Sequence, residues 1–98
     1  VKKSLDAQPE NAAYLDTLGW IYYKRGDVKQ ALEVLGKAAG KNADPVILDH
    51  LGDAQYAAGE AAAALVSWRK ALSSKPKPKD RTKIEEKIKA KFPNEQAK

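Results

Sequence analysis

A repeat of 33 residues constrains this chain more than any other feature of its sequence. The segment YLDTLGWIYYKRGD, residues 14–27, aligns with ILDHLGDAQYAAGE, residues 47–60. Identical residues stand 33 positions apart at Leu15/Leu48, Asp16/Asp49, Leu18/Leu51, Gly19/Gly52, Tyr23/Tyr56 and Gly26/Gly59. Recurrence at a fixed period of this length indicates an architecture built from stacked supersecondary units.

Within each unit, small and apolar residues recur at spacings of three and four. The second half of the first unit shows this at Ala31, Leu35 and Ala38, and the second unit shows it at Ala64, Trp68 and Ala71. These spacings follow the 3.6-residue period of an α-helix rather than the alternation of a strand. The sequence therefore predicts an all-α fold in which each unit is an antiparallel helix pair.

Capping residues divide the chain into five predicted helices. Asn11 suits the N-cap of the first helix, and Gly26 suits the left-handed turn after it. Asp27 is expected to cap the second helix, and Asp44 followed by Pro45 should start the third. The predicted helices span about 12–24, 28–40, 45–57, 60–73 and 79–91.

These helices give the 98-residue chain a modular organisation. The predicted parts are the end of a preceding repeat (1–11), a first helix pair (12–44), a second helix pair (45–77), a C-terminal capping helix (78–92) and a tail (93–98). Val1, Ser4 and Leu5 lie 34 residues before Leu35, Ala38 and Ala39. We therefore expect the chain to begin inside a repeat, as a fragment of a longer array would; the alternative is an N-terminal arm without a repeat history.

The two units resemble the tetratricopeptide repeat (TPR) family. The matching residues are Leu15, Leu18, Gly19, Tyr22, Ala31, Leu35 and Ala38 in the first unit, and Leu48, Leu51, Gly52, Ala64, Trp68 and Ala71 in the second. The offset is 33 rather than the family's 34, and Gln55 stands where the family has tyrosine. The resemblance implies an α-solenoid of antiparallel helix pairs whose first helices line a concave groove.

Gly19 and Gly52 stand inside predicted helices, where glycine costs about 0.5–1 kcal/mol relative to alanine. The resemblance implies that the two helices of a unit cross closely at these glycines. Ala31 and Ala64 would then be their small partners from the second helix. Trp68 falls in the same repeat position as Leu35, so we expect it in the core.

The sequence offers no chemistry for catalysis. The chain has no cysteine and one histidine, His50, with Asp49 and Asp53 nearby. A metal site needs three or four converging ligands, and no such set can be assembled. No serine stands beside a candidate base, and no glycine-rich phosphate loop is present. We therefore expect neither enzymatic activity nor a metal or cofactor.

What remains is a surface for binding other proteins. The resemblance implies a partner-binding groove formed by Asp16, Trp20, Tyr23, Lys24, Asp49, His50, Asp53 and Tyr56. Trp20 falls in the repeat slot that Asp53 fills, so the core does not require an aromatic residue there. It is either a binding anchor or a packing residue against a preceding repeat. An acidic and aromatic groove favours a protein or peptide partner with basic or apolar residues.

The net charge of +5 comes from the C-terminal third. Residues 1–68 carry seven Lys/Arg and nine Asp/Glu, whereas residues 69–98 carry eleven and four. The alternative function is therefore binding of nucleic acid or another acidic surface by the basic last helix, although few aromatic residues accompany the charge. No apolar run is long enough to insert into a membrane. Exposed repeat ends could support self-association, and the sequence fits cytoplasm and periplasm equally.

Overall fold

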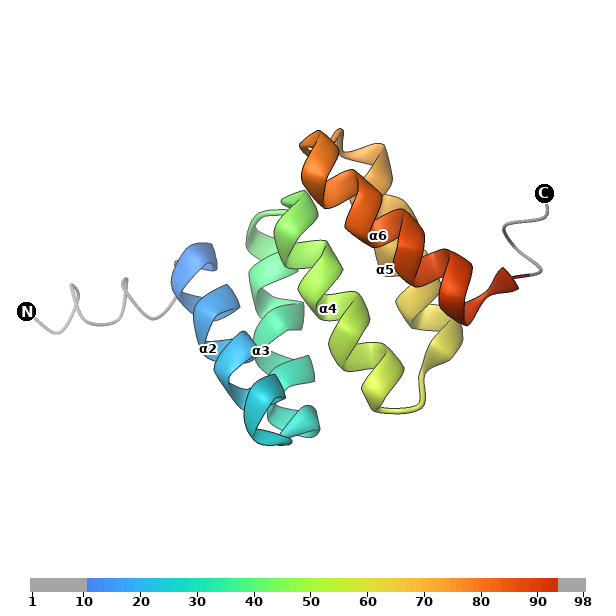
Figure 1. Cartoon of the computed structure of the whole chain (residues 1–98). Helices are drawn as coiled ribbons and strands as arrows, with labels where there is room; N and C mark the ends of the chain where they lie inside the picture. The colour runs from blue at the N-terminus through green and yellow to red at the C-terminus, as the bar shows by residue number, and fades with distance from the viewer. Residues whose placement is uncertain (1–10, 94–98) are drawn as a thin grey trace, which may run out of the picture.

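Five α-helices make up the described part of the chain, residues 11–93, and no strand is found there (Figure 1). The structure is a computed structural model. Its helices are α2 (Ala12–Arg25), α3 (Val28–Lys41), α4 (Pro45–Ala57), α5 (Ala61–Ser73) and α6 (Pro78–Lys91). Every predicted helix is present with both ends within one residue of prediction, which confirms the all-α fold class. The predicted repeat end before Asn11 and the tail after Pro93 lie outside the described residues.

Side-chain caps start α2 and α4 as predicted. Asn11 Oδ1 accepts a hydrogen bond from the N–H of Ala13 at 2.8 Å, and Asp44 Oδ1 accepts one from the N–H of Val46 at 2.8 Å. Pro45 follows Asp44 in the first turn of α4, where a backbone N–H has no partner within the helix. Each cap satisfies a donor that the helix itself leaves unpaired.

Asp27 occupies the predicted N-cap position of α3, but its side chain does not cap the helix. Its side chain makes no capping bond, and its backbone angles, φ −84° and ψ 66°, lie outside the extended conformation of a capping residue. The carboxylate of Asp27 instead lies 3.8 Å from Nε of Arg25. The tight turn that ends α2 therefore sets the backbone of Asp27 and directs its side chain away from the start of α3.

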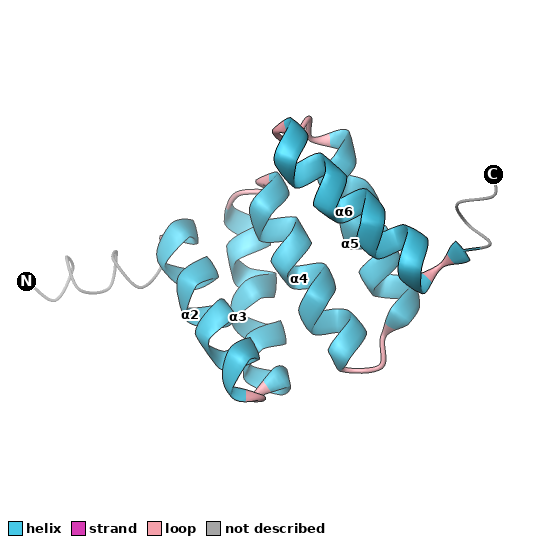
Figure 2. Cartoon of the chain, in the orientation of Figure 1, coloured by secondary structure: helices cyan, strands magenta, loops and turns pink. Residues whose placement is uncertain are grey.

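The same glycine turn ends α2 and α4, 33 residues apart. Gly26 and Gly59 have φ values of 88° and 86°, in the left-handed region that glycine adopts at little cost. In both turns, the residue after the glycine donates a hydrogen bond of 2.8 Å to a carbonyl in the last turn of the helix. This is the bonding pattern of a Schellman motif. The sequence repeat is thus also a repeat of backbone conformation, and Figure 2 shows both turns as short loops between paired helices.

An interior glycine lets the two helices of each pair approach closely. A Cβ atom added to Gly19 would lie 2.7 Å from Cδ2 of Leu35, and one added to Gly52 would lie 2.6 Å from Cδ1 of Trp68. The close crossing is therefore present, but its predicted partners are corrected. The atoms nearest to each glycine belong to a large side chain one helical turn beyond the predicted alanine, because the space left by glycine is filled by that side chain.

The core continues from the second helix pair into α6. Trp68 is fully buried, which confirms its prediction as a core residue. Ile84 and Ile88 of α6 are also buried, and they belong to the same cluster as Trp68 and Leu48. The last helix therefore covers the large side chain at the centre of the second pair.

Helix α4 is the central element of the fold. It packs against α2, α3 and α5, and hydrogen bonds from Lys87 connect it to α6. In Figure 1, α2, α4 and α6 lie toward the viewer, with α5 behind α6. The first helix of each pair and α6 consequently contribute to one side of the molecule, on which the predicted groove residues stand.

Candidate functional site

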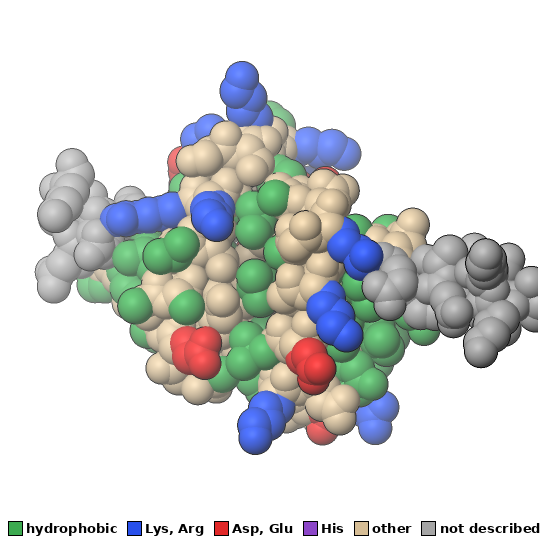
Figure 3. All heavy atoms as spheres, turned by 180° about the vertical axis from the view of Figure 1, so that it is seen from behind, with side chains coloured by type: hydrophobic (Ala, Val, Ile, Leu, Met, Phe, Trp, Pro, Cys, Tyr) green, Lys and Arg blue, Asp and Glu red, His purple; other side chains and the backbone are tan. Residues whose placement is uncertain are grey.

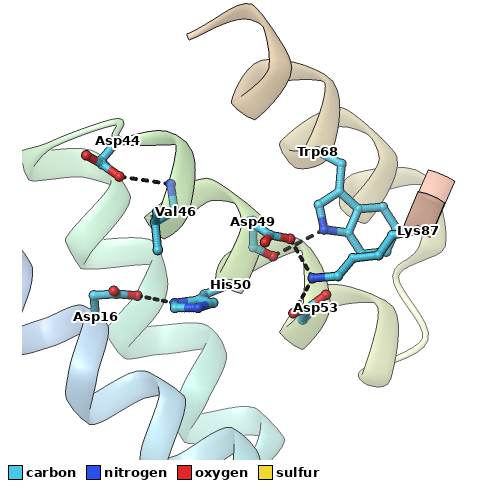
Figure 4. A network of polar contacts seen from close by, with 8 residues as sticks. All are labelled: Asp16, Asp44, Val46, Asp49, His50, Asp53, Trp68 and Lys87. Atoms are coloured by element: carbon cyan, nitrogen blue, oxygen red, sulfur yellow. Dashed lines mark hydrogen bonds and ion pairs between the residues drawn. The ribbon is translucent and has the colours of Figure 1, made fainter. Parts of the chain in front are cut away.

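Asp16 and His50 connect α2 to α4 across the candidate site. Nδ1 of His50 lies 2.7 Å from Oδ1 of Asp16 (Figure 4). The His50 side chain is only 21% exposed and the Asp16 side chain only 17%. The sequence placed both residues on a groove surface, and in the structure their side chains contact each other.

Lys87 of α6 connects the other two predicted carboxylates. Its Nζ donates to Oδ1 of Asp49 at 2.7 Å and to Oδ2 of Asp53 at 2.9 Å (Figure 4). The Asp49 and Asp53 side chains are 14% and 11% exposed. The backbone carbonyl of Asp49 also accepts a hydrogen bond of 3.2 Å from Nε1 of Trp68. Both acidic residues of α4 therefore pair with a lysine of the same chain.

The charges in this group are unequal, because two carboxylates share one ammonium. Burial raises the pKa of Asp53, and the negative charge of Asp49 adds to this rise, whereas the hydrogen bond and charge of Lys87 oppose it. Burial by itself would lower the pKa of Lys87, but the hydrogen bonds and charges of Asp49 and Asp53 outweigh it, and the pKa is raised. Lys87 is therefore held firmly in its charged form.

Trp20 lies at the centre of an aromatic cluster beside Asp16 and His50. Its ring stacks on the ring of Tyr23 at 4.9 Å between centroids and on the imidazole of His50 at 4.2 Å. The Lys24 ammonium lies 5.5 Å from the centroid of the Trp20 ring. Trp20 is partly buried by these contacts, so it presents only part of its ring to a partner.

A pocket of about 300 Å³ opens between α2, α4 and α6. It is lined by Tyr23, Asp53, Tyr56, Ala57, Lys87 and Lys91. Tyr56 is 38% exposed, and Nζ of Lys91 lies 4.8 Å from the centroid of its ring. Burial raises the pKa of the Tyr23 hydroxyl, and the charge of Asp53 adds to that rise. The pocket therefore combines two phenol rings with two lysine amines.

In-chain contacts bring all eight predicted groove residues together. We call this surface the aromatic face, and it consists of Asp16, Trp20, Tyr23, Lys24, Asp49, His50, Asp53, Tyr56, Lys87 and Lys91. The last two were not predicted. The 33-residue register pairs Lys87 with Ala54, a buried position, and so gave no hint of its role. The position of Lys87, beside Ile88 and three residues after Ile84, was a usable signal of this role. A lysine at the edge of an apolar stripe can pack its stem on the core and extend its amine past it.

No protein-family model matches this chain. A comparison with curated proteins also finds no significant match.

No group of three or more His, Asp or Glu side chains within residues 11–93 is arranged to hold a metal ion. Across the same residues, no helix has both the length and the apolar character needed to cross a membrane.

The buried hydroxyl of Ser67 donates to Oε1 of Gln55 at 2.6 Å. This bond gives Gln55, the departure from the expected tyrosine, a structural role within the second helix pair.

A larger hollow than the pocket of the aromatic face lies elsewhere, among α3, α4 and α5, and was not predicted. It has a volume of about 680 Å³, and its apolar lining includes Leu48, Leu51 and Ala63. Val66, also in its lining, is 55% exposed. The view from behind shows hydrophobic side chains gathered between the helices on that side (Figure 3). Its lining contains one charged residue, Lys70, whereas the pocket of the aromatic face places two lysines and an aspartate beside its two rings.

Proposed function

We propose that this chain is a protein–protein interaction module of TPR-like helical repeats, with a partner segment binding on the aromatic face. The repeated helix pairs, the glycine at each crossing and the identical turns at Gly26 and Gly59 support the repeat assignment. In such an architecture each unit packs mainly on its neighbours and leaves an extended surface for binding. The proposed role is that of a scaffold without catalysis.

The single observation that carries this proposal is the pocket between Tyr23 and Tyr56. Large apolar rings at a surface favour binding, since aromatic residues dominate the energetics of protein interfaces. The core of the second pair is already filled by Trp68 and Ile84, both fully buried. The ring of Tyr56 packs against Trp68 and Phe92, and the 38% of Tyr56 that stays exposed supports contact with a partner.

A second candidate is the binding of nucleic acid or another acidic surface by α6. It is favoured by the exposed lysines Lys79, Lys83 and Lys89 along that helix. However, Lys87 is bonded to two carboxylates of α4, which removes one charge from the outward row. A steep fall of affinity with salt, unaffected by changes at Tyr56, would favour this candidate.

The proposal is tested by selecting binders from a random library of displayed dodecapeptides on the 98-residue chain. Enriched peptides should lose binding to a Trp20→Ala or Tyr56→Ala variant by about 2 kcal/mol, the usual threshold for an interface hot spot. Val66→Ala, which changes an exposed apolar residue of the other hollow, serves as the matched control. Peptides that bind all three variants equally well would refute the aromatic face as the binding site.

A further inference from the structure

We infer that the partner segment is acidic, with Asp or Glu next to an apolar side chain. This inference rests on the proposed function and specifies the partner of the same face. The sequence suggested a basic partner, and this inference reverses that charge. The three aspartates of the face pair with His50 and Lys87, whereas Lys24 and Lys91 lie over aromatic rings.

The first step concerns the carboxylates. Asp16 is bonded to His50, and Asp49 and Asp53 are bonded to Lys87, at 2.7–2.9 Å in each case. All three side chains are less than one-fifth exposed. A basic partner would have to displace Lys87 to reach Asp49 or Asp53. That exchange would break the polar link between α6 and α4 and would gain nothing that the chain does not already have.

The second step concerns the cations. Lys24 and Lys91 are exposed, and their ammonium groups lie over the rings of Trp20 and Tyr56. Within residues 11–93, neither lysine forms an ion pair with a carboxylate. Lys87 uses two of its three N–H donors on Asp49 and Asp53, which leaves one donor at the pocket that it lines. The groups that an approaching partner meets are therefore ammonium donors.

The third step combines charge with shape. The pocket places the rings of Tyr23 and Tyr56 beside the amines of Lys87 and Lys91. An apolar side chain can bury its surface against the rings, while an adjacent carboxylate accepts hydrogen bonds from the amines. Lys24 lies beyond Tyr23, over Trp20, and could pair with a second acidic residue. An acidic peptide fits this arrangement better than a nucleic acid, which calls for a continuous basic stripe.

The experiment uses the same dodecapeptide selection and reads the composition of the enriched peptides. We expect Asp or Glu next to Phe, Trp, Leu or Ile. Affinity of the enriched peptides should fall about ten-fold in the double variant Lys24→Gln/Lys91→Gln. The matched control is Lys29→Gln/Lys37→Gln, which removes equal charge from exposed positions of α3 and should change affinity less than about two-fold. Far-ultraviolet circular dichroism verifies that both variants are folded.

Three results would overturn the inference. Enriched peptides rich in Lys or Arg would show that the face prefers a basic partner, and they would leave the proposed function standing if Trp20→Ala still abolished binding. Equal losses in the two double variants would show that net charge, rather than the two lysines, attracts the peptides. Equally strong binding of a twelve-nucleotide oligothymidylate to the same lysines would assign the face to nucleic acid. Peptides that bind Trp20→Ala and Tyr56→Ala as tightly as the parent chain would refute the proposed function itself.

Discussion

Lys87 of α6 holds Asp53 of α4 through a hydrogen bond of 2.9 Å between Nζ and Oδ2. The same amine reaches Asp49 at 2.7 Å, so a single lysine supplies the positive charge for two carboxylates. This arrangement connects the last helix to the aromatic face. It also determines the charge that the face presents, because it removes the acidity that the sequence suggested.

Replacing Lys87 should therefore destabilise the chain through its carboxylates. Lys87→Met retains an apolar stem of similar length but leaves Asp49 and Asp53 without their cation. We expect the free energy of unfolding to fall by about 1–2 kcal/mol, less than for a fully buried pair because the Lys87 side chain is partly exposed. Urea denaturation at neutral pH measures this loss. Adding Asp53→Asn should recover part of it, and a double variant as unstable as Lys87→Met would contradict the account.

The pKa shifts predict a loss of stability at high pH. The folded-state pKa of Lys87 is above its ordinary value of 10.5, so its contribution is complete below 10.5 and is lost as the pH rises through the folded value. The raised pKa of Tyr23 acts in the same direction above its ordinary value of 10.0. The free energy of unfolding should thus fall as the pH rises above the ordinary pKa values of these two groups, and it should fall less in Lys87→Met than in Lys83→Met, the exposed control. Equal pH dependence in the two variants would count against the Lys87 assignment.

Two classes of helical glycine should respond oppositely to alanine. At Gly52 the new Cβ would collide with Trp68, whose buried ring cannot move aside freely, so Gly52→Ala should destabilise by about 1–3 kcal/mol. At Gly36 nothing lies within 4 Å of an added Cβ, so Gly36→Ala should stabilise by up to about 1 kcal/mol through helix propensity. Thermal unfolding of both variants measures the difference. A Gly52→Ala protein that melts at or above the parent temperature would refute the close crossing.

Ile84 tests the packing of α6 on the second helix pair. This side chain is fully buried in the cluster that contains Trp68, so Ile84→Ala should lower the free energy of unfolding by about 2–5 kcal/mol. Lys83→Ala changes the exposed neighbouring position and should alter it by less than about 0.5 kcal/mol. Chemical denaturation followed by circular dichroism compares the two. Equal stability of the variants would mean that α6 does not belong to the core.

The sequence predicted what depends on nearby residues. Asn11, Gly26 and Pro45 act on the backbone within one turn, so the helix ends were found almost to the residue. The identity of the side chain beside Gly52 depended on how two helices cross, and the pattern favoured Ala64 where Trp68 is found. Such a choice is decided by three-dimensional packing, which a linear spacing does not encode.

The electrostatics of the aromatic face were the least predictable part. The positions of its aspartates followed from the repeat, but their partners did not. Helix α6 begins 33 residues after α4, but Lys87 falls in the register of the buried Ala54, so no repeat position pointed from Lys87 to Asp49 and Asp53. The pairing emerges only when α6 packs against α4 and carries the lysine stem along with Ile84 and Ile88.

The central claim is that a partner segment binds on the aromatic face, and the most direct measurement is nuclear magnetic resonance mapping of one enriched dodecapeptide on the ¹⁵N-labelled chain. The account predicts that the largest shifts fall on the indole N–H of Trp20 and on backbone amides near Tyr23, Tyr56 and Lys91. The indole N–H of the buried Trp68, bonded to the Asp49 carbonyl, serves as an internal reference that shifts less. Shifts concentrated around Leu51 and Val66, in the hollow on the other side, would contradict the claim.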